Sequence, residues 1–349
     1  MTGTILLDIE PYRQEAAQLY PQIISNIVEG RMDSPRIQTV TSPDGAANEF
    51  RVYGNLAAAK TVVVEGVPAS ARLVDASFSM RSSVEKAVYG PDVCVVTHQT
   101  YAPDEMTRFT KGKDAEPSQC REVRNGSFRP QAERLASILQ SLDLVDEQDL
   151  VIKGFSGAAD LAVEFAYQNI TNPSFGQRRI DVVSATEPAR SHPMSRFAKL
   201  RSTAKSGSDL YDNIVASDSP ALLAAHGIDP MELGAKVAFK LRIAAKVARY
   251  LGTDPSGSWA LLNGYATNQS LAQLNDMATT YKDQAPQQIV GRALDSTVTG
   301  PDLFAALIPS TRRSLFEVSG DHSVIDNLKV AALFALITAG ELQKSKQAA

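Results

Sequence analysis

The sequence predicts an α/β fold with a mostly parallel sheet that is covered by helices on both faces. From about residue 36 onward, short strand-like runs alternate with helical runs, and most of the strand-like runs are continuously apolar. Such alternation favours parallel strands joined by helical crossovers. The chain has 349 residues, of which 44% are hydrophobic and 21% charged, so it can bury the large core that this fold requires.

Eight segments are expected to be strands. The first two, 36–45 and 48–55, should form a β-hairpin because Pro-Asp-Gly lies between two segments rich in β-branched residues. The other six should be buried strands, and they lie at 61–66, 92–99, 149–156, 180–187, 287–296 and 313–322. Helices are expected at 129–144, 157–169, 301–309 and 327–343.

Residues 190–282 break the alternation, because they contain helical pieces rich in Ala and Leu and no convincing strand. The clearest pieces are 219–227 and 231–252. Structureless loops of this length are uncommon in compact domains, so we interpret the block as an inserted helical cap. The core domain would then consist of residues 1–189 and 283–349.

Charge is unevenly divided between these two parts. Residues 190–282 hold 11 Lys and Arg against 7 Asp and Glu, a net charge of +4. Because the whole chain has a net charge of −4, the remainder has a net charge of −8.

In the predicted cap helix, Leu233, Val237 and Leu241 recur every fourth position, and we expect this stripe to lie on the domain below. Lipid-surface binding by the same helix is the alternative interpretation.

Composition argues against several classes of protein. The acidic net charge gives no electrostatic reason for nucleic acid as a partner. Cys94, Cys120 and four scattered histidines form no disulfide framework or metal spacing, and no dinucleotide or phosphate loop is present, so no cofactor or metal is expected. No apolar run reaches the roughly 18 residues of a membrane span. Acidic residues near the N-terminus argue against a signal peptide. We therefore expect a cytoplasmic protein without stable membrane insertion, and leave homodimerisation open.

Residues 154–158 read Gly-Phe-Ser-Gly-Ala and lie between a predicted buried strand and a predicted amphipathic helix. A serine on such a sharp turn projects its hydroxyl outward, and small neighbours let the backbone pass close to itself. The helix N-terminus behind it supplies N–H groups and a positive dipole that suit a developing oxyanion. Ser156 is therefore a candidate nucleophile, although a serine before a helix can also be an N-cap.

Two candidate partners of Ser156 follow later strands. Asp295 ends the strand-like run at 287–296, and His322 follows the last strand. Because loops beyond the carboxyl ends of parallel strands meet at one edge of the sheet, the three side chains should converge there.

Each partner also has competitors elsewhere in the sequence. Glu187 follows another buried strand and competes with Asp295, which could instead cap a following helix. His98 lies at the same edge of the sheet and could line the pocket, and the other rivals of His322 are His192 and His226.

With these residues in place, the chain resembles the α/β-hydrolase superfamily. The segments that carry the resemblance are 65–70, 154–158, 290–298 and 319–323, and the likeness extends over roughly residues 36–343. The resemblance implies an α/β-hydrolase fold with an inserted helical cap, and the chain order Ser, Asp, His is that of this superfamily. It implies that Ser156 is the nucleophile, His322 the general base and acid, and Asp295 the group that orients His322.

The same resemblance implies that the oxyanion hole consists of the backbone N–H groups of Val67 and Gly157. Two positions depart from the pattern: Ala158 stands where a glycine is usual, and Glu65 where many relatives have histidine. A carboxylate near an oxyanion would oppose its charge unless paired, so Glu65 should either bind a basic group or stabilise the loop.

The expected activity is that of a serine hydrolase, similar to a carboxylesterase or lipase, acting on a small-molecule ester or related acyl bond. Glu65, Phe155, His98 and Glu187 are the further residues we expect at the pocket. Acyl transfer, or hydrolysis of an amide or carbon–carbon bond, is the alternative on the same fold. A receptor-like protein with little turnover is the alternative outside catalysis, and Glu65 is the residue that favours it.

Overall fold

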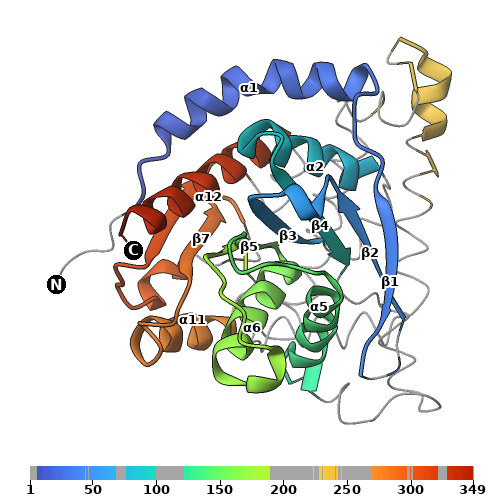
Figure 1. Cartoon of the computed structure of the whole chain (residues 1–349). Coiled ribbons are helices and arrows are strands. Elements are labelled where there is room, and N and C mark those ends of the chain that lie inside the picture. The colour runs from blue at the N-terminus through green and yellow to red at the C-terminus, as the bar shows by residue number, and fades with distance from the viewer. Residues whose placement is uncertain are drawn as a thin grey trace.

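The computed structural model contains one eight-stranded sheet with helices on both faces (Figure 1). It describes residues 6–43, 45, 47–67, 76–99, 122–123, 125–188, 223, 228–229, 231–239, 241–242, 245, 269–296, 299, 302–320 and 328–348.

All eight predicted strands are confirmed. They are β1 (Arg36–Thr41), β2 (Ala47–Tyr53), β3 (Thr61–Val67), β4 (Val93–Gln99), β5 (Asp149–Phe155), β6 (Val182–Thr186), β7 (Gln287–Ala293) and β8 (Arg313–Val318). Their order in the sheet is β1-β2-β4-β3-β5-β6-β7-β8. The pairs β1–β2 and β2–β4 are antiparallel, and all other neighbours are parallel. Every strand except β2 therefore runs in the same direction, and the carboxyl ends of these seven strands lie at one edge of the sheet.

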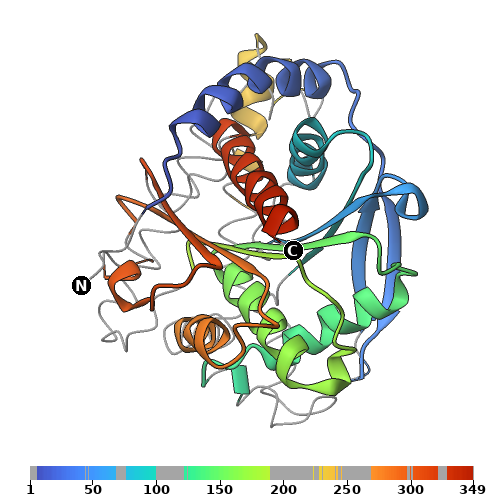
Figure 2. The ribbon, with the colours of Figure 1, turned by 60° about the vertical axis from the view of Figure 1, so that its left-hand side comes forward.

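Helices cover the two faces of this sheet in separate groups, which Figure 2 shows above and below the strands. On one face lie α1 (Glu10–Val28), α2 (Ala76–Tyr89) and α12 (Leu328–Ala348). On the other lie α5 (Arg129–Ser141), α6 (Gly157–Thr171) and α11 (Ser270–Thr279). The predicted helices at 129–144, 157–169 and 327–343 correspond to α5, α6 and α12, whereas α1 and α2 were not predicted.

Alternate residues of each strand enter different cores, as the period of a strand requires. Val62 and Val64 of β3 belong to the apolar cluster that includes α5 and α6. Val63, between them, belongs to the cluster that includes α1, α2 and α12. Because side chains on both faces of the parallel strands β3 to β8 are covered, these strands are mostly apolar, which explains why they were visible in the sequence.

The helix predicted at 301–309 is wrong, because the described part of this segment contains only one 3-10 turn at Phe304–Ala306. The backbone groups that a helix would pair internally are paired with side chains instead. Asn275 donates to the carbonyl of Ala306 and accepts from the N–H of Ile308, both at 2.9 Å. Arg313 Nη1 donates to the Ile308 carbonyl at 2.7 Å. Tertiary hydrogen bonds therefore override the local helical pattern.

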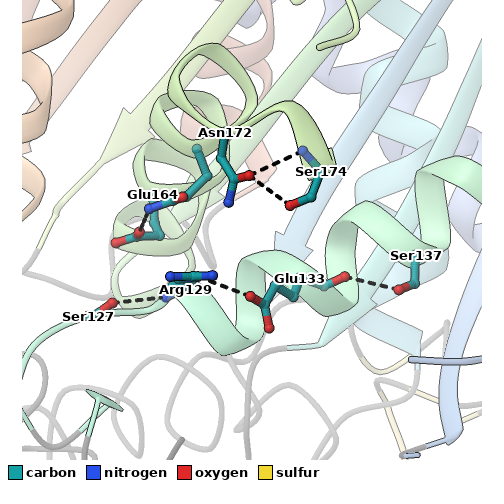
Figure 3. Close-up of polar contacts among 8 residues, drawn as sticks. Ser127, Arg129, Glu133, Ser137, Glu164, Asn172 and Ser174 are labelled. Carbon is teal, nitrogen blue, oxygen red and sulfur yellow. Dashed lines mark hydrogen bonds and ion pairs between the residues drawn. The ribbon is translucent and has the colours of Figure 1, made fainter. Parts of the chain in front are cut away.

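The ends of α5 and α6 are held by short-range polar contacts (Figure 3). Asn172 Oδ1 accepts from the backbone N–H of Ser174 at 3.1 Å and from its hydroxyl at 2.8 Å, which ends α6 and begins a 3-10 turn. In the first turn of α5, Arg129 Nε donates to Glu133 Oε1 at 3.0 Å, the i,i+4 spacing of a helical ion pair. The Asn172 contacts therefore fix where α6 ends, and the Arg129–Glu133 pair supports the first turn of α5.

Only part of the expected cap block lies among the described residues. Its last helix, α11, packs against α6, and Leu274 and Met277 of α11 belong to the apolar core. The boundary predicted at residue 282 stays a prediction, but this end of the block packs as part of the core.

The apolar stripe expected to face the domain lies instead toward solvent. Leu233, Val237 and Leu241 are 73%, 48% and 66% exposed, so that prediction is wrong for these residues. Among the described residues of this helical segment, Phe239 is buried, and at 100° per residue it lies on a different side of the helix from the stripe. Burial of the aromatic ring therefore sets the rotation of this helix. Within the described residues, no helix has the length and apolarity needed to cross a membrane.

Candidate active site

Ser156 lies between β5 and α6, at the carboxyl edge of the sheet. Its backbone has φ 56° and ψ −129°, a conformation that residues with a Cβ seldom adopt. Its N–H donates to the carbonyl of Thr186, the last residue of β6, at 2.9 Å. The neighbouring strand thus holds the strained turn, and α6 begins at the next residue. The turn has the strand-to-helix form that the sequence predicted.

The glycines around this turn are required by close backbone approach. A Cβ added at Gly154 would lie 1.9 Å from the carbonyl oxygen of Ala158, so only glycine fits there. A Cβ added at Gly66, on β3, would lie 3.1 Å from the Ala158 Cβ and 3.3 Å from His98 Nε2. The Cβ of Ala158 is therefore accommodated by a glycine on the facing strand.

The Ser156 side chain does not cap α6, because its hydroxyl accepts no capping hydrogen bond from the first N–H groups of the helix. Its carbonyl, in contrast, accepts from the N–H of Ala159 at 2.8 Å and begins the helix. The N-cap interpretation therefore fails for this serine. A hydroxyl that is not used to cap the helix is what a nucleophile at this position requires.

The two N–H groups implied for the oxyanion hole lie at the end of a strand and at the start of the neighbouring helix. Val67 is the last residue of β3, and Gly157 is the first residue of α6. The register pairs Gly66 of β3 with Gly154 of β5, which brings the end of β3 beside the turn that carries Ser156. The first N–H groups of a helix have no intrahelical acceptor and carry partial positive charge, which favours an anion there.

Asp295 is exposed and lies just beyond β7, where the ladder with β8 continues. Leu294 N–H donates to the Val318 carbonyl and Asp295 N–H to the Gly320 carbonyl, both at 2.9 Å. Asp295 is therefore hydrogen-bonded to the residue two positions before His322. His322 itself lies outside the described residues, and its pairing with Asp295 and Ser156 remains a prediction.

Glu187, the competing acid, is buried at the end of β6 with φ 56°. Its N–H donates to the Gly291 carbonyl at 2.8 Å, and its Oε1 accepts from the N–H of Ala293. Both bonds tie the end of β6 to β7. The carboxylate is thus engaged in holding two strands together.

The other two predicted pocket residues are buried. His98 lies in β4 beside Gly66, and the register pairs these two residues. Phe155 belongs to the apolar cluster on the side of α1, α2 and α12. His98 therefore lies beside the carboxyl end of β3, whereas Phe155 packs in the core.

Glu65 forms a buried ion pair, in which Arg81 Nη1 of α2 lies 2.8 Å from Glu65 Oε1. A second buried pair joins Lys153 of β5 to Glu85 of α2. Sequence reasoning missed Arg81, Glu85 and Lys153. The available signal was one charge within each of two apolar strand runs, Glu65 and Lys153, which must find partners when buried.

Among the described residues, no group of three or more His, Cys, Asp and Glu side chains could hold a metal ion. Cys94 is buried, and burial raises the pKa of its thiol to about 11. It is therefore a core residue with little thiolate character at neutral pH.

Comparison with known proteins bears on the fold. No family model matches the chain, and neither does any curated protein. Among solved structures it is similar to an enol-lactonase from Burkholderia xenovorans LB400, at 11% identity and a TM-score of 0.52, over 88% of this chain and 100% of that one. It is also similar to a bromoperoxidase from Bacillus anthracis, at 13% identity and a TM-score of 0.51, over 88% and 100% of the two chains. The chain has the α/β-hydrolase fold.

Proposed function

We propose that the protein is a serine hydrolase that cleaves an ester or related acyl bond of a small molecule. The observation that carries the proposal is the Ser156 turn, with its positive φ, its place between β5 and α6, and a hydroxyl that does not cap the helix. Asp295, hydrogen-bonded next to the segment that leads to His322, supports the same assignment.

The proposed reaction has two halves. His322 accepts the Ser156 proton as Ser156 Oγ attacks the carbonyl carbon, and the N–H groups of Val67 and Gly157 stabilise the oxyanion. His322 then gives the proton to the leaving oxygen as its bond to the acyl group breaks. Water, deprotonated by His322, attacks the acyl-enzyme and releases the acid and Ser156. Asp295 keeps the imidazole oriented and stabilises its charged form.

Replacing Ser156 by alanine tests the assignment most directly. Ser156→Ala should abolish turnover of p-nitrophenyl esters while leaving the melting temperature nearly unchanged. Ser137→Ala, on α5, is the matched control and should keep full activity, since the Ser137 hydroxyl donates to the Glu133 carbonyl of its own helix (Figure 3). Retained turnover in Ser156→Ala would refute the proposal.

The nature of the reaction needs separate experiments, because one fold supports many chemistries. Product analysis with a competing alcohol distinguishes acyl transfer from hydrolysis. Panels of amides, and of substrates with a cleavable carbon–carbon bond, test whether the protein hydrolyses those bonds. A fluorophosphonate probe distinguishes an enzyme from a receptor-like protein, because only an activated Ser156 would be labelled.

A second candidate role, docking of the cap on a lipid surface, is favoured by the exposed stripe of Leu233, Val237 and Leu241. The segment 231–252 holds five Lys and Arg and one Glu, so an anionic surface would complement it. Sedimentation with anionic vesicles should bring down the wild type but not Leu233→Ser/Leu241→Ser. Equal sedimentation of both proteins, or of neither, would rule this role out.

A further inference from the structure

Four charged side chains are buried together between the sheet and α2. Glu65 and Lys153 come from β3 and β5, and Arg81 and Glu85 from α2. The side chains of Glu65, Arg81, Glu85 and Lys153 are 7%, 9%, 3% and 9% exposed. Two positive and two negative charges balance, as burial requires.

The four residues are neighbours in pairs, both along the elements that carry them and between the sheet and α2. Glu65 and Lys153 are register partners in adjacent parallel strands. Arg81 and Glu85 are one helical turn apart on α2. Arg81 binds Glu65 at 2.8 Å, and Lys153 binds Glu85, so each ion pair joins one strand to the same helix.

This network lies close to the candidate oxyanion hole, because Glu65 and Lys153 are each two residues before the last residue of their strands. From Glu65, β3 runs through Gly66 to Val67, and from Lys153, β5 runs through Gly154 to the Ser156 turn. The Glu65–Arg81 pair also joins the two ends of the segment 65–81, which contains Val67. Movement of the Glu65 side chain or of α2 would therefore be transmitted to the Val67 amide.

The negative charge of Glu65 matters because this residue lies beside the candidate oxyanion hole. A carboxylate two residues from an oxyanion donor opposes the negative charge that develops on the substrate, and low dielectric strengthens this effect. Glu65 Oε1 is paired with Arg81, while Glu65 Oε2 is buried without a hydrogen-bond partner in the described part of the chain. Arg81 is the ion-pair partner that the structure gives this carboxylate.

We propose that Arg81 is a positioning residue for the oxyanion hole, which holds the end of β3 in place and cancels the charge of Glu65 beside the developing oxyanion. The inference rests on the proposed serine hydrolase function. A buried ion pair adds little stability over apolar residues of similar size, so its position beside the site is the reason to assign it a role in catalysis.

The test is a double-mutant cycle on kcat, measured per active site by titration with a fluorophosphonate. Arg81→Met should lower kcat about 10²- to 10³-fold, as loss of an oxyanion donor does, with KM within about threefold. Glu65→Gln/Arg81→Met removes the uncompensated carboxylate and should recover at least about tenfold of that loss. Arg81→Lys keeps the positive charge but lacks the planar guanidinium, and its kcat should lie between those of Arg81→Met and the double variant.

The control is a partly exposed ion pair at the opposite end of β5, where Lys346 Nζ lies 2.6 Å from Asp149 Oδ2 and the two side chains are 40% and 10% exposed. Lys346→Met should lower the melting temperature without changing kcat per active site. If Arg81→Met lowers only the melting temperature in the same way, the proposal is overturned and the pair is merely structural. Where Arg81→Met does not fold, unchanged kcat in both Arg81→Lys and the double variant would overturn it.

The two proposals fail in different ways. A wild-type protein with neither ester turnover nor probe labelling refutes the hydrolase function and the role of Arg81 together. An active wild type whose Arg81 variants keep full kcat per site refutes only the role of Arg81.

Discussion

The carboxylate of Glu187 accepts a hydrogen bond from the backbone N–H of Ala293, two residues before Asp295. The two candidate acids therefore have different surroundings on neighbouring strands. Glu187 is buried and ties β6 to β7, whereas Asp295 is exposed where the β7–β8 ladder approaches the segment of His322. This relationship favours Asp295 as the acid of the proposed triad.

We expect Asp295→Asn to lower kcat for ester hydrolysis by roughly 10³- to 10⁴-fold with little change in melting temperature, because the amide would stabilise the wrong tautomer of the histidine. Glu187→Gln keeps an oxygen that can accept from Ala293 and should retain most activity. Steady-state kinetics of both purified variants checks this. The opposite pattern would make Glu187 the acid.

Gly154→Ala should destabilise the fold by at least about 3 kcal/mol, the upper part of the range for overpacking. The added Cβ would meet the Ala158 carbonyl oxygen and the Ala159 nitrogen, and neither backbone atom can rotate away as a side chain would. Gly234→Ala is the control, since a Cβ there meets nothing within 4 Å. It should stabilise its helix by about 0.5–1 kcal/mol. Urea unfolding of both variants measures the difference, and a folded, fully active Gly154→Ala would contradict the close approach.

Glu164, on α6, should make stability depend on pH. Burial raises the pKa of its carboxyl above the ordinary value, against the opposing hydrogen bonds from Gln273 and Gln168. A raised folded-state pKa means that the group's contribution to stability is complete below the unfolded value and is lost as pH rises through the folded value.

Glu164→Gln stays neutral, so its free energy of unfolding relative to wild type should increase between pH 4.5 and pH 7. Urea melts at several pH values provide the comparison. Glu133→Gln, which removes a carboxylate from α5 (Figure 3), controls for the change in net charge. A Glu164→Gln difference that does not vary with pH would show that burial leaves this carboxyl unaffected.

The Cys94 thiol should be almost unreactive in the folded protein, because burial raises its pKa to about 11 and shields it from solvent. In a Cys120→Ser background, labelling by a thiol reagent at pH 8 should be at least about 100-fold slower in the native state than in urea. Absorbance of the released thiolate follows both reactions. Fast native labelling would show that β4 opens readily.

Local pattern was sufficient for the strands and for the Ser156 turn. A strand buried on both faces is mostly apolar whatever surrounds it, so the strands from β3 to β8 were predictable from their apolar runs. β1 and β2 are partly exposed, and they were predictable from the Pro-Asp-Gly turn between them. The small residues around Ser156 reflect a backbone approach within five residues, which is likewise local. α2 escaped prediction because its buried face includes Arg81 and Glu85, which look like solvent-facing residues until their partners are known.

The order of the eight strands along the chain and the place of Ser156 between a strand and a helix follow from the amino-acid sequence alone, since they depend on residues close together in the chain. Long-range packing, in contrast, is what pairs Glu65 with Arg81, joins β6 to β7 through Glu187, and turns the Leu233 stripe toward solvent. Each of these depends on segments that meet only after folding. Whether a charge or an apolar side chain can be buried at a given place is set by the partner that the fold brings to it.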